Sequence, residues 1–303
     1  MQGHEVTAID DLSTGRASNL SDLIASPNFT FTEGSILDAD VLSRLVQDSD
    51  YVFHLAAAVG VFNIVNNPLA SLLTNIRGTE NVLEAAFASN TPVFLTSSSE
   101  VYGKNISDSL KESDDRILGS PVTLRWSYSE AKAIDESIAF AYFVEKQLET
   151  RIVRFFNTVG PRQLGAYGMV VPRFVRAALT NEPITIYGDG NQTRCFAHVY
   201  DVVDAVMAVA FADNTIGKVI NIGNNFEISI NELAKKIIDE TSSTSKIVYV
   251  PYEEAYGDGF EDMERRVPNI DLINHLVSWK PQRDLSTMIT DISAEMKKDF
   301  KGK

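Results

Sequence analysis

The stretch Arg125-Trp126-Ser127-Tyr128-Ser129-Glu130-Ala131-Lys132 places a tyrosine four residues before a lysine, at the start of a long helical pattern. Apolar residues at helical spacing predict a helix over residues 129–146. Positions i and i+4 share one face of a helix, so Tyr128 and Lys132 can act on the same object. A free tyrosine has a pKa near ~10, and a fixed neighbouring cation favours its anion. The stretch therefore predicts a tyrosine base activated by a lysine.

A second stretch, Thr96-Ser97-Ser98-Ser99-Glu100-Val101-Tyr102-Gly103, follows the hydrophobic strand predicted for Val93-Phe94-Leu95. It ends that strand in a cluster of hydroxyls and one carboxylate. The Tyr-x-x-x-Lys spacing alone arises by chance in many helices. With the hydroxyl cluster upstream of it, a catalytic site becomes the better interpretation.

Together the two stretches resemble the extended short-chain dehydrogenase/reductase family, in particular its nucleotide-sugar epimerases, dehydratases and decarboxylases. The resemblance continues in chain order through Arg154-Phe155-Phe156-Asn157-Thr158-Val159-Gly160-Pro161-Arg162, Val171-Pro172-Arg173-Phe174, Gly188-Asp189-Gly190-Asn191-Gln192-Thr193-Arg194-Cys195-Phe196 and Arg266-Val267-Pro268-Asn269-Ile270. It implies an α/β fold, with a Rossmann-type doubly wound parallel sheet and a smaller mixed α/β substrate-binding domain. The implied NAD-binding domain comprises residues 1–158 and about 192–222, and the implied nucleotide-sugar-binding domain comprises about 159–191 and 223–303.

The composition fits a folded enzyme. A chain of 303 residues with 44% hydrophobic residues can bury the core of one large or two medium domains. Lys+Arg 27 against Asp+Glu 41 gives a net charge of −14, which argues against nucleic-acid or membrane partners because both need a net basic face. A single cysteine, no run of ~18 apolar residues and no signal-peptide pattern fit a cytoplasmic protein. No metal site is predicted.

The segment Glu5-Val6-Thr7-Ala8-Ile9-Asp10-Asp11 is typical of a strand that ends in carboxylates. In a dinucleotide-binding fold, an acid at the end of the second strand accepts hydrogen bonds from the adenosine ribose. Asp10 holds that place in the motif, with Asp11 and Leu12 beside it, although an ordinary strand-end turn gives the same pattern. A carboxylate here repels a 2′-phosphate, so the predicted cofactor is NAD rather than NADP.

The resemblance implies further NAD contacts along the chain. Ser35 stands where the family commonly places an aspartate that binds the adenine amino group, and small residues after the strand of residues 50–55 let a flat cofactor approach the backbone. His54, within that strand, is better explained as a satisfied core histidine than as a catalytic one. The complete implied NAD set is Asp10, Asp11, Leu12, Ser35, Ile36, Leu55, Ala56, Ala57, Asn75, Ser97, Tyr128, Lys132 and Phe155.

The resemblance also implies the chemistry. Tyr128, as a phenolate, takes the proton of a sugar hydroxyl while hydride moves from the same carbon to NAD. Lys132 lowers the pKa of the tyrosine and binds the nicotinamide ribose, and Ser98 hydrogen-bonds the reacting oxygen. The implied contacts with a nucleotide-diphosphate sugar are Ser98, Ser99, Tyr128, Asn157, Val171, Arg173, Tyr187, Arg194 and Arg266. The last two arginines match positions that grip the diphosphate, which suits the planar fork of arginine.

Members of this family differ in what happens to the 4-keto intermediate. A dehydratase uses an Asp-Glu pair, whereas Ser99-Glu100 lacks the acid half. A UDP-glucuronate decarboxylase often has Ser-Glu-Val-Tyr-Gly and an arginine at the Arg194 position, so Glu100 and Arg194 would be its catalytic pair. The sequence around Tyr128 and over residues 157–163 looks closer to epimerases. The prediction is therefore NAD-dependent C4 epimerisation of the UDP-glucose/UDP-galactose type, with decarboxylation as the alternative.

The family's first strand, glycine-rich phosphate loop and first helix would precede Glu5, where only Met1-Gln2-Gly3-His4 stand. A start codon assigned too far downstream and a true truncation both explain this, and we favour the first because the remaining motifs are those of a working enzyme. A true truncation would weaken NAD binding severely and would leave a non-catalytic relative as the alternative.

Two long helical patterns, over residues 67–89 and 129–146, form a four-helix bundle across a two-fold axis in many relatives. A homodimer is therefore expected from the resemblance. The apolar stripes of these helices could equally belong to the intramolecular core.

Overall fold

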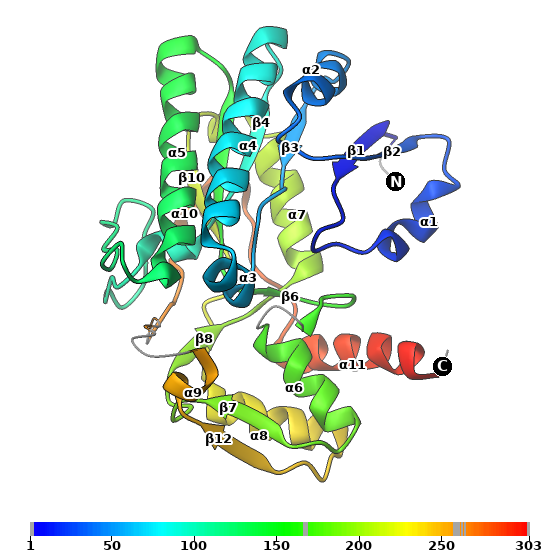
Figure 1. Cartoon of the computed structure of the whole chain (residues 1–303), viewed down its shortest axis with the longest axis vertical. Helices are drawn as coiled ribbons and strands as arrows, with labels where there is room; N and C mark the ends of the chain where they lie inside the picture. The colour runs from blue at the N-terminus through cyan, green and yellow to red at the C-terminus, as the bar shows by residue number, and fades with distance from the viewer. Residues whose placement is uncertain (1–2, 166–168, 257–260, 262, 264, 302–303) are drawn as a thin grey trace.

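A four-stranded parallel sheet with the strand order β10-β5-β4-β3 forms the middle of the molecule (Figure 1). The computed structural model describes residues 3–165, 169–256, 261, 263 and 265–301. The strands of this sheet are β3 (Val52–His54), β4 (Val93–Ser98), β5 (Thr150–Phe155) and β10 (Val219–Ile222). Strands β4 and β5 are buried along almost their whole length, as strands covered on both faces must be.

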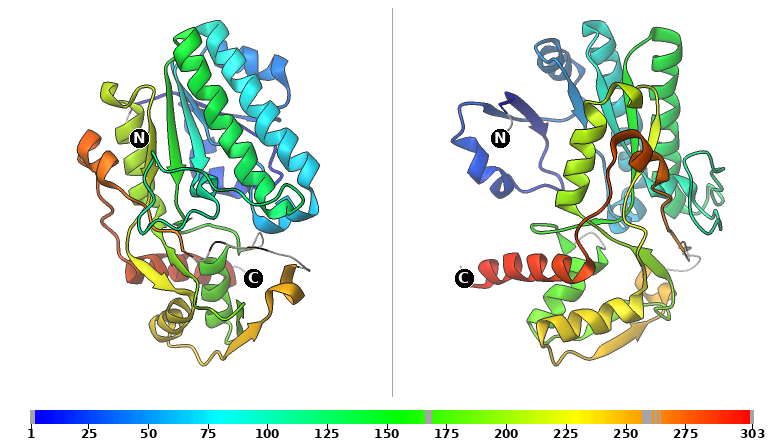
Figure 2. Two further views of the ribbon diagram at one scale, coloured as in Figure 1. Left: turned by 90° about the vertical axis from the view of Figure 1, so that its left-hand side faces the viewer. Right: turned by 180° about the vertical axis from the view of Figure 1, so that it is seen from behind.

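Helices cover both faces of this sheet. The long helices α4 (Pro68–Ser89) and α5 (Ser127–Lys146) lie side by side over one face, and α7 (Val199–Ala210) and α10 (Asp271–Val277) lie on the other side (Figures 1 and 2). A proline at the first turn of α4 fits a helix start, because that N–H has no partner within the helix. The shorter α2 (Ala39–Gln47) packs against α4. This arrangement is the doubly wound α/β fold that the sequence predicts.

Strands β1 (Val6–Asp10) and β2 (Phe29–Glu33) form a separate parallel pair. This pair lies beside the four-stranded sheet together with α1 (Ser21–Ile24) (Figure 1). Among the described residues, β1 and β3 each pair along one edge only.

The smaller half of the molecule has its own hydrophobic core. The parallel pair β7 (Ile184–Tyr187) and β12 (Ile247–Val250) lies with α6 (Val170–Leu179), α8 (Ile230–Thr241) and α11 (Leu285–Lys301) below the sheet in Figure 1. Helix α8 begins with a capping box, in which the Ser229 side chain and Glu232 satisfy each other's backbone N–H groups. Buried apolar residues from all three helices and β7 form this core.

The remaining elements are short. They are β6 (Thr158–Val159) paired with β9 (Ala197–His198), β8 (Thr193–Cys195) paired with β11 (Glu227–Ser229), the helices α3 (Val61–Asn66) and α9 (Tyr252–Tyr256), and the 3-10 helices η1 (Ala17–Leu20), η2 (Ser99–Tyr102), η3 (Leu124–Trp126) and η5 (Asp213–Thr215). Elements η2 and η3 contact α5 and therefore bring the two stretches of sequence quoted above together.

A buried ion pair joins α5 to the sheet. Arg154 on β5 donates from Nε and Nη2 to the two carboxylate oxygens of Glu136, each over 2.8 Å. Ser97 at the end of β4 donates to the same carboxylate over 2.6 Å. Both charged side chains are about 5% exposed. Because a buried charge needs a partner, this contact fixes the position of α5 relative to the strand ends.

The replacement Arg154→Leu is expected to lower the free energy of unfolding by about 3–5 kcal/mol, because it leaves the Glu136 carboxylate buried without its cation. Urea denaturation followed by circular dichroism measures the loss. The matched control is Lys236→Ala, which breaks the exposed pair with Glu240 and should cost less than about 1 kcal/mol. A similar small loss in both variants would contradict the role given to Arg154.

Candidate active site

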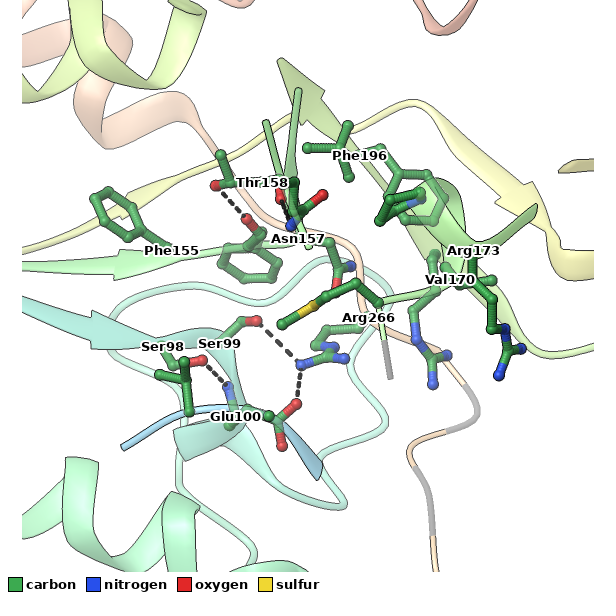
Figure 3. Close-up of a pocket in the computed structure, with 18 of the residues that line it drawn as sticks. Ser98, Ser99, Glu100, Phe155, Asn157, Thr158, Val170, Arg173, Phe196 and Arg266 are labelled. Carbon is green, nitrogen blue, oxygen red and sulfur yellow. Dashed lines mark hydrogen bonds and ion pairs between the residues drawn. The ribbon is translucent and has the colours of Figure 1, made fainter. Parts of the chain in front are cut away.

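A cavity of about 470 Å³ lies between the carboxyl ends of β4 and β5 and the smaller half of the molecule (Figure 3). Ligands bind at this end of the strands in doubly wound sheets. Predicted site residues that line the cavity are Ser98, Ser99, Glu100, Tyr128, Phe155, Asn157, Arg173, Tyr187, Arg194 and Arg266. The structure therefore brings most of the predicted catalytic and substrate residues together.

Glu100 lies between two arginines at one side of this cavity. Its Oε1 is 2.6 Å from Nη1 of Arg266, and its Oε2 is 2.6 Å from Nη1 of Arg125. Burial disfavours the carboxylate, but the charges and hydrogen bonds of the two arginines outweigh it and hold the pKa of Glu100 well below its usual range. Glu100 is therefore ionised at neutral pH and cannot act there as a general acid.

Tyr128 lies in the first turn of α5 and lines the cavity together with Ser98. Burial, together with the negative charges of Glu100 and Asp135, raises the pKa of Tyr128. The role of Lys132 in lowering this pKa stays a prediction. In the structure the Lys132 ammonium is 3.1 Å from the Asp135 carboxylate.

The cavity is strongly positive in a protein that is strongly negative overall. Among the described residues that line it, the charged side chains are four arginines, Arg125, Arg173, Arg194 and Arg266, and one carboxylate, Glu100. Arg125, Arg194 and Arg266 are less than a tenth exposed. A concave site of one sign attracts ligands of the opposite sign. The cavity therefore suits a ligand with several negative charges.

Polar and aromatic groups occupy the part of the cavity formed by the smaller half. Arg173 lies 4.2 Å from the centre of the Tyr187 ring, a cation–π contact, and donates to the backbone carbonyl of Thr185. Gln192 donates to the hydroxyl of Tyr252 over 2.9 Å. Asn157, which follows β5, donates to the Cys195 carbonyl, and this hydrogen bond orients its side chain in the cavity wall.

The prediction that Val171 contacts substrate is wrong. Val171 is fully buried and belongs to the core of the smaller half, together with Phe174 and Val175. Three- and four-residue spacing places all three on the inner face of α6. Its neighbours Val170 and Pro172 line the cavity instead.

A second cavity, of about 260 Å³, lies between β1 and α4. It is lined by five residues of the predicted NAD set, which are Asp10, Asp11, Ile36, Ala56 and Ala57. The hydroxyl oxygen of Ser71, also in its wall, is buried without a hydrogen-bond partner. Carboxylates at a strand end, small residues opposite them and an unsatisfied hydroxyl fit the adenosine end of NAD.

The remaining residues of the predicted NAD set do not line this second cavity. Tyr128 and Phe155 line the larger cavity instead. Leu12 and Ser35 adjoin residues of the second cavity in the chain, and Leu55 is 55% exposed. Asn75 uses its amide to hold the backbone of Ala58, with its Oδ1 accepting from the N–H over 2.7 Å. Ser97 is engaged with Glu136 and Lys132 with Asp135. Their contacts with NAD stay predictions.

Four residues with clear structural roles at the site were not predicted from the sequence. Arg125 precedes Tyr128 by three residues and reaches Glu100, and Gln192 and Tyr252 form a polar pair in the cavity wall. Asp135 also escaped notice, although its position three residues after Lys132 was a usable signal for an ion pair on the helix. His54, in contrast, is confirmed as a core histidine, 4% exposed and in contact with Thr79.

A doubly wound sheet, a helix with Tyr128 and Lys132 near its start, and a neighbouring strand that ends in hydroxyls define a short-chain dehydrogenase/reductase type of enzyme. Residues 1–223 match the NAD dependent epimerase/dehydratase family, and the chain belongs to that family. Its cofactor is accordingly NAD.

Three known proteins are similar over most of the chain. The UDP-N-acetyl-alpha-D-glucosaminuronate decarboxylase of Bacillus cytotoxicus is 40% identical over 281 residues, which cover 92% of this chain and 86% of the relative. The UDP-glucuronic acid decarboxylase 1 of Danio rerio is 34% identical over 283 residues, which cover 93% of this chain and 64% of the relative. The crystal structure of the UDP-glucuronic acid 4-epimerase of Bacillus cereus, in complex with UDP-glucuronic acid and NAD, has a TM-score of 0.86 at 27% identity and covers 97% of this chain and 91% of that chain.

These similarities agree with the predicted enzyme family but shift the predicted reaction. Both sequence relatives named above are decarboxylases, whereas the sequence analysis preferred a UDP-glucose 4-epimerase and kept decarboxylation as its alternative. The alternative is the better supported of the two.

In the part of the chain that the structure describes, no helix is long and apolar enough to cross a membrane.

The replacement Glu100→Gln is expected to lower the free energy of unfolding at pH 7 by about 3 kcal/mol, because it leaves two buried guanidinium groups without their anion. The pKa of Glu100 is depressed on folding, so its contribution is present above the ordinary glutamate pKa of 4.5 and is lost as the pH falls below it. The difference between wild type and variant should therefore shrink in acid. Urea denaturation at several pH values tests this, and a difference that does not change with pH would contradict it.

Proposed function

We propose that this protein catalyses the NAD-dependent decarboxylation of a UDP-linked hexuronate, of the UDP-glucuronate type or its 2-acetamido counterpart. The observation that carries the proposal is the cavity charge, four arginines against one carboxylate, in a cavity that Tyr128 also lines. A nucleotide uronate carries a diphosphate and a carboxylate, and arginine recognises both groups through paired N–H donors. The names of the two sequence relatives support the same substrate class.

Tyr128 and Ser98 would act at the C4 hydroxyl of the sugar. Ser98 holds the oxygen, and Tyr128 accepts its proton as the C4–H bond breaks. NAD, when bound, supplies the hydride acceptor for this step and the donor for its reversal. The resulting ketone lies two bonds from the carboxylate, so that the C5–carboxylate bond can break with its electron pair delocalised onto the ketone oxygen. Carbon dioxide leaves, C5 takes up a proton, and C4 is reduced again, so NAD is regenerated.

Glu100 has an indirect part in this scheme. Because Arg125 and Arg266 hold it ionised, it does not donate the proton that C5 receives. Its carboxylate instead fixes the two guanidinium groups, each through one Nη1 atom. This differs from the sequence prediction, in which Glu100 and Arg194 form the catalytic pair. Nε of Arg266 is buried without a hydrogen-bond partner among the described residues and can donate to an anionic substrate.

C4 epimerisation of a uronate is the second candidate. The Bacillus cereus enzyme is named for this reaction and was crystallised with UDP-glucuronic acid and NAD. Both reactions share the oxidation at C4 and the same charges in the substrate. They differ in whether the carboxylate is lost while the ketone exists, so product analysis separates them.

The test is to incubate the NAD-loaded protein separately with UDP-glucuronate, UDP-N-acetylglucosaminuronate and UDP-glucose, and to identify the products by NMR. The proposal predicts a UDP-pentose and carbon dioxide from one of the uronates, no net NADH, and no turnover of UDP-glucose. A hexuronate epimer without carbon dioxide would establish the second candidate. UDP-galactose formed from UDP-glucose would overturn both.

The replacement Arg266→Gln is expected to lower kcat/KM for the uronate by at least about 100-fold, the loss expected when a buried charge pair with substrate is broken. Arg176→Gln is the matched control, because Arg176 lies on α6 with an exposed side chain, and it should leave kcat/KM within about twofold. Equal activity of the two variants would remove Arg266 from the proposed site.

The homodimer stays a prediction. Helices α4 and α5 expose apolar side chains, namely Leu69, Phe87, Ile134, Phe140 and Val144, each between 43% and 68% exposed. Such a surface on two adjacent helices fits the four-helix contact that the resemblance implies.

A further inference from the structure

Glu227 is a charged residue beside the larger cavity that the proposed chemistry does not use. It begins β11, which pairs with β8 so that Glu227 lies opposite Cys195 and Ile228 lies opposite Arg194. The described residues that line the cavity include Arg194 but not Glu227, whose side chain is 28% exposed. Because neighbouring residues of a strand point to opposite faces, Glu227 and Arg194 belong to different faces of this strand pair.

The Glu227 carboxylate binds Thr193, the residue before Arg194. Thr193 lies two residues before Cys195 on β8, which makes it a diagonal neighbour of Glu227 on the same face of the strand pair. Its hydroxyl donates to Oε1 of Glu227. Arg194 in turn donates from Nη1 to the Thr193 carbonyl over 2.8 Å. The orientation of one cavity arginine therefore depends on a residue that Glu227 holds.

The same carboxylate binds Arg265, the residue before Arg266. Nε and Nη2 of Arg265 donate to the two oxygens of Glu227, each over 2.8 Å, and such a fork fixes direction as well as distance. Arg265 is 40% exposed, whereas Arg266 is 7% exposed and lines the cavity. On the other side of Arg266, the Val267 carbonyl accepts from the N–H of Leu110 over 2.8 Å. The chain is therefore held on both sides of this second cavity arginine.

Glu227 is ionised at neutral pH and can be replaced without loss of the fold. The hydrogen bonds from Arg265, and to a lesser extent from Thr193, hold the pKa of its carboxyl below the usual range, although burial opposes them. Both members of the ion pair with Arg265 are partly exposed. Such pairs contribute little to the free energy of unfolding. An effect of Glu227 on ligand binding can therefore be measured in a folded protein.

We propose that Glu227 is a positioning residue for Arg194 and Arg266: from outside the cavity, its carboxylate holds the residue that precedes each arginine in the chain. The inference rests on the proposed function, in which the cavity arginines bind the anionic groups of the substrate. Side chains that are oriented before the substrate arrives lose less conformational freedom on binding, so the site binds the substrate more tightly. One carboxylate thus orients two arginines from separate segments of the chain.

The first test measures the affinity for UDP-glucuronate by calorimetry. The NAD-loaded protein contains Tyr128→Phe in every variant, so that the sugar is not oxidised. Glu227→Ala is expected to raise Kd about tenfold or more, because each arginine that must be ordered on binding costs affinity. The matched control is Glu240→Ala, since Glu240 is also 29% exposed and paired with a cation, Lys236. The control should leave Kd within about twofold, and an equally small change in Glu227→Ala would overturn the proposal.

Second substitutions show whether Glu227 acts through the two arginines. Thr193→Val breaks the contact beside Arg194, so it should raise Kd when Glu227 is present and have no further effect in Glu227→Ala. Glu227→Ala should raise Kd by a smaller factor when Arg266→Gln is already in place, because one of the two arginines that it positions is then absent. Full additivity of either pair of substitutions would overturn the proposal.

Steady-state kinetics with Tyr128 intact separate positioning from a loss of folded protein. Glu227→Ala should raise KM for the uronate and leave kcat within about twofold, the pattern of an interaction made equally in the ground state and the transition state. A fall in kcat at an unchanged KM is the pattern of a smaller folded fraction and would overturn the proposal. Because the calorimetry requires no turnover, an absence of carbon dioxide would contradict the proposed function without changing the Kd ratios that test Glu227.

Discussion

The placement of Glu100 between Arg125 and Arg266 is the constraint on which the rest of the site depends. A carboxylate in this setting is stable only with cations in contact, and each arginine comes from a different part of the chain. Arg125 precedes α5, and Arg266 lies in the chain between α9 and α10. Through these two ion pairs, one acidic side chain joins the end of β4, the segment before α5 and the segment before α10.

The same constraint explains how the cavity can be positive in an acidic protein. Glu100 offsets one of the two guanidinium charges beside it, and Arg173 and Arg194 add theirs from the smaller half. The result is an excess of positive charge that is oriented before any ligand binds, which reduces the reorganisation required in the reaction. Burial of the charged groups strengthens their interaction with an anionic sugar.

Much of the fold could be predicted from the sequence because strong periodic patterns determine it. The helical pattern over residues 67–89 corresponds to α4, and the strand predicted for Val93-Phe94-Leu95 begins β4. The start of α5 lies two residues before its apolar pattern begins, because Ser127 and Tyr128 complete its first turn. Ser98, the last residue of β4, and Asn157, just after β5, both line the cavity in which the sequence predicted substrate contacts.

What the sequence could not supply was the pairing of charges between distant segments. Arg266 is separated from Glu100 by 166 residues, and no local pattern announces that contact. The orientation of the Val171 side chain toward the core likewise depends on which face of α6 packs there, and this contact is made by residues distant in the sequence. Short motifs shared by a whole family indicate the common redox step better than its outcome, so they did not separate epimerisation from decarboxylation.

The most direct measurement for the central claim is calorimetric titration of the NAD-loaded protein with UDP-glucuronate and with UDP-glucose, at two salt concentrations. If the Glu100-held arginines receive the carboxylate, the uronate should bind at least about tenfold more tightly, equivalent to ~1.4 kcal/mol, and Arg266→Gln should remove the difference. Equal affinities for the two sugars in the wild-type protein would contradict the account.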